Sequence, residues 1–111
     1  MATFITRGRL SAEAVKGLIN KPEDRHEAVS RLIEAAGGKL LNYFVTTGDT
    51  DFLLISEADD GETAVAAVMA AAAAGTVTDV TTSRAWTSAE FKFVAEKAGA
   101  VMATYRAPGQ G

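Results

Sequence analysis

The chain has 111 residues, with 11 Lys and Arg against 14 Asp and Glu, and a formal net charge of −3. This length fits one domain with a modest core, and the mild acidity argues against nucleic-acid binding, which normally needs a basic face. Because the chain has no cysteine and one histidine, we expect no disulfide, no metal site and no cofactor.

The sequence carries no signal for export or membrane insertion. Its N-terminus lacks a basic segment followed by a long apolar stretch, as a secretory signal would have. The longest apolar run, residues 64–74, is much shorter than the ~20 residues of a membrane helix. We therefore expect a cytoplasmic protein without membrane contact.

The first half of the chain predicts a strand followed by two helices. Residues 2–7 are rich in Thr, Phe and Ile and end at Gly8, which favours a strand. Ser11 is a typical N-cap for a helix beginning at residue 12. Pro22 interrupts that helix, and we expect a second one with Pro22 near its first position. It should end at Ala36, before Gly37-Gly38.

Residues 39–47 and 52–57 predict a β-hairpin around the turn 48–50. Strict alternation would place Leu41, Tyr43 and Val45 on one side of the first strand and Leu40 and Phe44 on the other. Both sides of this strand are therefore apolar. A sheet with one face in water should alternate more cleanly between apolar and polar residues.

The remaining elements are a helix, a strand and a last helix. Asp60 precedes a helix that should run to about Ala74 and stop at Gly75, followed by a strand over residues 77–86. Thr87-Ser88-Ala89-Glu90 matches a capping box for a helix through about residue 98. We expect residues 1–98 to form one domain and residues 99–111 to form a partly flexible C-terminal tail.

The order β-α-β-β-α-β plus a C-terminal helix predicts an α+β, ferredoxin-like fold. Two helices cover one face of such a sheet, and apolar residues on the other face also require a cover. The last helix is one candidate, but a second copy is the simpler one. We expect a homodimer, or a higher homo-oligomer, in which two sheets pack face to face as a dimeric α/β barrel.

From about residue 3 to residue 91 the sequence resembles the GYD-domain family of small bacterial proteins. The motifs that carry this likeness are Gly37-Gly38-Lys39, Tyr43, Gly48-Asp49-Thr50-Asp51, Glu57-Ala58-Asp59-Asp60, Pro22, Arg25, Arg84-Ala85-Trp86-Thr87 and Glu90-Phe91. The resemblance implies a dimeric α/β-barrel fold, in a family without a known function. Thr50 stands where the family usually has its aromatic residue.

Arg25 is the leading candidate for ligand binding. On a helical wheel it falls in the same apolar arc as Val29, Leu32 and Ile33. A guanidinium that points toward a sheet needs an anion. That anion is either a bound ligand or a structural partner, for which Asp49, Asp51 and Asp79 are candidates.

Three residues are weak candidates for catalysis. His26 has a side chain suited to acid–base chemistry, although a histidine near a helix start is more often a surface residue. Asp49 and Asp51 flank the hairpin turn and offer two carboxylates. Aspartates in turns more often bond their own backbone.

Tyr43, Arg84 and Trp86 lie on predicted strands. An aromatic ring beside an arginine suits a small-molecule pocket, but the same residue types are enriched at dimer interfaces. The alanine-rich segment 64–74 indicates close helix packing.

No strong catalytic motif is present, such as a P-loop, a dinucleotide fingerprint or a nucleophile elbow. Two functions stay open. The first is an oligomeric small-molecule-binding or accessory protein, with an anionic or aromatic ligand between sheet and helices. The second is a cofactor-free enzyme of the dimeric α/β-barrel type, an isomerase or monooxygenase acting on a small aromatic compound.

Overall fold

The computed structural model describes residues 1–110, so the last residue of the expected tail, Gly111, lies outside the described part. The strands are β1 (Ala2–Leu10), β2 (Lys39–Val45), β3 (Phe52–Ala58) and β4 (Val77–Ala85). The helices are α1 (Ala12–Asn20), α2 (His26–Ala35), α3 (Gly61–Ala73) and α4 (Ser88–Val101), followed by a 3₁₀ turn, η1 (Met102–Thr104). No helix among the described residues is long and apolar enough to span a membrane.

The four strands form one antiparallel sheet in the order β2-β3-β1-β4. The central strands β1 and β3 lie side by side, and the outer strands β4 and β2 flank them. This order, with helices in both β-α-β crossovers, is the ferredoxin-like arrangement that the element order predicts. The prediction of an α+β, ferredoxin-like fold is confirmed.

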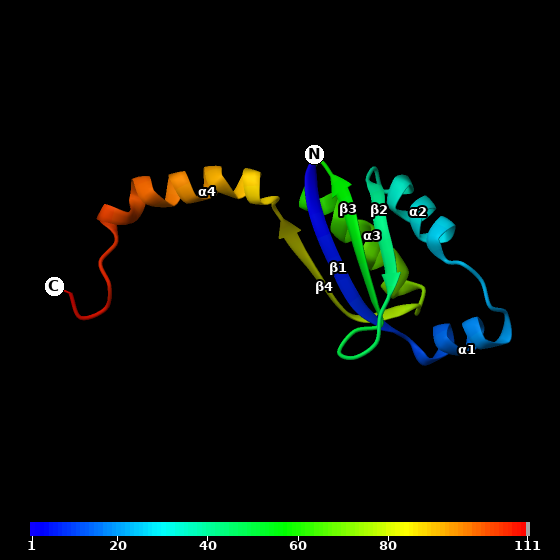
Figure 1. The fold of residues 1–111 in the computed structure, drawn as a ribbon. Coiled ribbons are helices and arrows are strands. Elements are labelled where there is room, and N and C mark those ends of the chain that lie inside the picture. The colour runs from blue at the N-terminus through cyan, green and yellow to red at the C-terminus, as the bar shows by residue number, and fades with distance from the viewer. Residues whose placement is uncertain (111) are drawn as a thin grey trace.

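The sheet has one covered face and one open face. Along β3, buried residues alternate strictly with partly exposed ones, so Phe52, Leu54 and Ser56 face the helices. The core joins this face to α2 and α3 through Ile33, Leu40 and Ala67. Figure 1 shows α2 and α3 on one side of the sheet, with no helix over the other side.

Helix α4 leaves the sheet instead of covering it (Figure 1). All of its residues are exposed, and the described part of the chain extends over 63 × 31 × 22 Å. The last helix was one of two candidates to cover the open face. Within this chain it does not cover that face, so this alternative is wrong. The helix runs three residues beyond the expected end at residue 98, to Val101.

Local capping signals explain where three helices begin. The side chains of Ser11, Asp60 and Thr87 accept hydrogen bonds from backbone N–H groups in the first turns of α1, α3 and α4. At α4 the capping box is complete, because the Glu90 carboxylate also accepts from the Thr87 N–H. At the end of α2, Gly37 takes a φ of 102°, which a residue with a Cβ rarely adopts.

Two predicted strand features are wrong. Strand β1 does not close at Gly8 but continues to Leu10. A Cβ on Gly8 would lie 3.0 Å from both the Phe52 ring and Val80, so glycine allows close approach inside the strand. In β2, the register shifts between Leu40 and Asn42, which brings Leu40 and Tyr43 to the same face.

Helix α2 also begins later than predicted. Residues 22–25 lie outside it, and the first residue is His26, not Pro22. The Asp24 carboxylate accepts a hydrogen bond from the His26 N–H at 2.9 Å. This bond satisfies one of the backbone N–H groups that have no partner in the first turn of a helix. Residues 22–25 form a loop between α1 and α2.

Candidate functional site

A cavity of about 1020 Å³ lies between the sheet and the helices. Its floor consists of apolar strand residues such as Phe52, Leu54 and Val80, and its walls come from α1, α2 and α3. Exposed residues of the loop between α1 and α2, including Lys21 and Glu23, form part of its rim. A cavity of this size lies at the upper end of the range for small-molecule sites.

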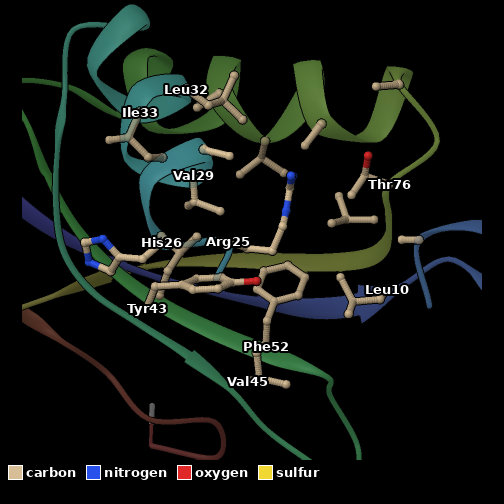
Figure 2. Close-up of a pocket in the computed structure, with 18 of the residues that line it drawn as sticks. Leu10, Arg25, His26, Val29, Leu32, Ile33, Tyr43, Val45, Phe52 and Thr76 are labelled. Carbon is tan, nitrogen blue, oxygen red and sulfur yellow. The ribbon is translucent and has the colours of Figure 1, made fainter. Parts of the chain in front are cut away.

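Arg25 reaches into this cavity from the residue before α2 (Figure 2). Its Nη1 donates a hydrogen bond to the Glu23 carboxylate at 3.0 Å, and its side chain is 38% exposed. The ion-pair partner of Arg25 is thus Glu23, and the expectation of Asp49, Asp51 or Asp79 is wrong. Glu23 is only two residues from Arg25 in the same loop, so the ion pair forms locally and needs no contact with a distant segment of the chain.

Tyr43 lies beside Arg25 on the same side of the sheet, because the shift in β2 turns it toward the helices. Its ring packs against Phe52, with the ring centroids 6.5 Å apart. Burial raises the pKa of Tyr43 above the ordinary value of 10.0, and the positive charge of Arg25 offsets part of this rise. The phenol therefore stays protonated near neutral pH and can donate a hydrogen bond. No group among residues 1–110 bonds to this hydroxyl.

Most other polar groups of the cavity are already bonded or lie at its rim, and the Thr76 side chain lines the side away from His26. The Thr6 hydroxyl, which is buried, shares a hydrogen bond of 3.1 Å with the Thr82 hydroxyl. His26 lines the cavity but is exposed, and Figure 2 shows its ring at the edge, turned away from Arg25. The structure thus brings Arg25, Tyr43 and His26 to one cavity, with the first two inside it.

The remaining sequence candidates lie elsewhere. Arg84 and Trp86 are at the far end of β4 from the cavity, where the Arg84 guanidinium stacks over the Trp86 ring at 4.7 Å. Arg84 also donates hydrogen bonds to the backbone oxygens of Thr3 and Ala85. The Trp86 ring in turn meets Phe91 edge to face, at 5.9 Å between centroids. This cluster connects the end of the sheet to α4.

Asp49 and Asp51 also lie outside the cavity lining. The Asp51 carboxylate accepts a hydrogen bond from the Leu10 N–H at 2.9 Å, and the Asp51 N–H donates to the Gly8 oxygen at 2.7 Å. These bonds tie the hairpin turn to the end of β1. Within residues 1–110, no three acidic or histidine side chains come together in a group that could hold a metal ion.

Sequence reasoning missed the part that α3 plays in the cavity. Residues of this helix and its C-cap line it: Ala67, Val68, Ala70, Ala71 and Ala74. The sequence signal was the alanine-rich segment itself, which indicates close packing. In the structure, α3 lies close to the sheet near Ala64 and Ala67, both buried, but leaves open space beside Ala71.

Fold and cavity together define a ferredoxin-like α+β protein with a mostly apolar pocket on the helix side of its sheet. The model of the GYD domain family matches residues 4–95. The chain therefore belongs to the GYD domain family. A search of curated proteins found no match.

Three solved structures are similar to this chain at low sequence identity. TTHA0845 from Thermus thermophilus is 17% identical, with a TM-score of 0.50 over 79% of this chain and 96% of that one. FFRP-DM1 is 15% identical, with a TM-score of 0.47 over 78% of this chain and 100% of that one. A Neisseria meningitidis transcriptional regulator, solved in complex with L-Met, is 19% identical, with a TM-score of 0.49. That match covers 78% of this chain and 51% of the regulator. At these identities the likeness concerns the fold alone.

Proposed function

We propose that this protein binds a small amphipathic anion in the cavity between its sheet and its helices. One observation carries the proposal: Arg25 and Tyr43 both line a mostly apolar cavity, the charge of Arg25 acts on the Tyr43 phenol, and the Tyr43 hydroxyl has no hydrogen-bond partner among the described residues. A pocket with apolar walls and a few convergent polar groups is the usual form of a small-molecule site.

The chemistry of the two groups favours a carboxylate. Arg25 uses one of its donors for Glu23, and a guanidinium has five in a planar fork. The free donors match the two oxygens of a carboxylate. The protonated Tyr43 can add a further hydrogen bond to the same anion. The apolar strand residues would then enclose the rest of the ligand.

Binding is better supported than catalysis. An enzyme of this kind needs a titratable group that faces the substrate. His26 lies at the rim, and Asp51 is bonded to the backbone of Leu10 outside the cavity. The Glu23 and Asp24 carboxylates also line the cavity, but they come from exposed loop residues. The described cavity thus supplies groups that hold an anion more clearly than groups that move a proton.

We further propose that the protein acts as a homodimer through the open face of its sheet. Ile5 pairs with Ile55, and Phe44 pairs with Leu53, so these apolar residues form a continuous surface across three strands. Phe44 is 53% exposed. Since α4 projects away, a second sheet packed on this face would bury the surface, as in a dimeric α/β barrel.

The binding proposal can be tested by calorimetric titration with 3-phenylpropanoate and with its neutral analogue 3-phenylpropanol. Wild-type protein should bind the acid more tightly than the alcohol. Loss of a charge-assisted hydrogen bond in Arg25→Ala should weaken acid binding about 10- to 100-fold. The alcohol should be affected much less.

Arg31→Ala is a matched control. Arg31 lies on the same helix, exposed and paired with Glu27, and does not line the cavity. This variant should bind the acid like wild type. Equal binding by the Arg25 and Arg31 variants, or equal binding of acid and alcohol by wild type, would contradict the proposal.

A further inference from the structure

The cavity depends on the small side chains of α3. Ala67, Ala71 and Ala74 recur at helical spacing and all line it. A helix that packs on a sheet usually presents larger apolar residues along this stripe, which would fill the space. Ala67 is 2% exposed and belongs to the core, whereas Ala71 is only partly buried. The unfilled volume therefore begins between these two positions.

Helix α1 forms the opposite wall. Its Ala14 and Leu18 line the cavity, and none of its residues is buried. At the end of the cavity, the Ser11 N–H donates to the Thr76 oxygen at 2.9 Å and joins the start of α1 to the start of β4. Leu10 and Val77 lie at this junction and also face the cavity. This half of the site is thus a mostly apolar channel between α1 and α3, with the Thr76 side chain at its end.

The polar anchors Arg25 and Tyr43 lie between the two ends of the cavity (Figure 2). Figure 2 shows Tyr43 beside the base of the Arg25 side chain, whose guanidinium extends toward α3, with Leu10 and Thr76 on the far side of the cavity from His26. An anion bound to Arg25 would leave the channel between α1 and α3 for the remainder of the ligand. A short acid would reach Arg25 and leave this channel unfilled.

We propose that the ligand is a monocarboxylic acid with an extended apolar tail, and that Ala71 sets the length of tail the site accepts. This inference rests on the proposed function, because it takes Arg25 as the carboxylate anchor. The tail would lie along the alanine face of α3 and beneath α1. A cavity at the upper end of the small-molecule range has room for such a tail in addition to the carboxylate.

The test compares decanoate with butanoate by calorimetric titration, at concentrations where decanoate is monomeric. Wild type should bind decanoate at least about 100-fold more tightly, because each further buried methylene adds to the affinity. Ala71→Leu should weaken decanoate binding at least about 10-fold, since the added side chain occupies the channel, and should leave butanoate within about 2-fold.

Ala72→Leu is the matched control, because Ala72 is the next residue of the same helix, exposed and outside the cavity lining. It should bind both acids like wild type. Leu18→Phe narrows the channel from the side of α1, a helix without buried residues, so the substitution disturbs no core residue. It should weaken decanoate binding as Ala71→Leu does, and it tests the inference even if Ala71→Leu folds poorly.

The outcomes separate this inference from the binding proposal. Equal affinity of wild type for both acids, with both lost in Arg25→Ala, would overturn the long-tail ligand and keep the anion site. Equal effects of Ala71→Leu and Ala72→Leu on decanoate would overturn the role of Ala71. Binding of neither acid would count against the anion site itself, and against the tail with it.

Discussion

At the scale of single residues, the same residue type has different roles according to its surroundings. Asp51 and Asp49 are two residues apart in one turn, yet only Asp51 bonds to another strand, through the Leu10 N–H. Arg25 and Arg31 are two arginines of one region, and only Arg25 lines the cavity. Residue type and position in a turn indicate which residues are candidates for a functional site. The groups that each side chain contacts in the folded protein decide whether it stabilises the fold or lines the cavity.

Asp51→Ala should destabilise the fold by about 1–3 kcal/mol, because the Leu10 N–H loses a hydrogen bond to a charged acceptor. Urea unfolding at fixed protein concentration measures this change. Asp49→Ala is the control: Asp49 is exposed and has no hydrogen bond among the described residues, so its loss should cost less than about 0.5 kcal/mol. Equal destabilisation by both variants would show that the bond to Leu10 is not what Asp51 contributes.

At the scale of elements, α4 differs from the other helices because all of its residues are exposed in the described part of the chain. A helix of this length is marginal in water without packing. The contacts that hold it are local: the capping box at Thr87 and Glu90, and the edge-to-face contact of Trp86 with Phe91. Hydrogen bonds from Thr87 lower the pKa of the Glu90 carboxyl below its ordinary 4.5. The ionised Glu90 carboxylate therefore stabilises α4 fully at pH values above its ordinary pKa of 4.5, and this stabilisation is lost as the pH falls through the lowered pKa.

Thr87→Ala removes one capping bond and should destabilise α4 by about 1 kcal/mol. The expected result is faster amide hydrogen exchange, by about 5-fold, in α4 alone. Amides of the central strands β1 and β3 serve as the internal reference, because their bonds do not involve this helix. If the strand amides accelerate as much as those of α4, the helix is coupled to the sheet and is not an independent arm.

At the scale of the whole molecule, the distribution of apolar surface predicts self-association. Phe44→Glu places a charge on the open face of the sheet, and should weaken the dimer at least about 100-fold because a two-fold interface contains the residue twice. Light scattering after size-exclusion chromatography measures the molar mass of the protein in solution and so distinguishes dimer from monomer. Phe44 is more than half exposed in the single chain, so the substitution spares the core.

Met69→Glu is the control for this experiment. Met69 is 66% exposed and lies on the outer side of α3, away from the open sheet face. This variant should stay dimeric. A wild-type protein that is monomeric and fully folded in dilute solution would refute the face-to-face dimer.

The sequence alone determined the element order, and with it the ferredoxin-like fold, because capping residues and hydrophobic periodicity act within a few residues. Thr87 and Glu90 indicate the start of α4 for this reason. Only the tertiary structure decided the rest. The shift in β2 turns Tyr43 toward Arg25, and the spacing of α3 from the sheet turns a stripe of alanines into the wall of a cavity. Such features depend on how closely segments that are distant in the sequence pack against one another. A pattern within a few residues of the sequence does not determine this packing.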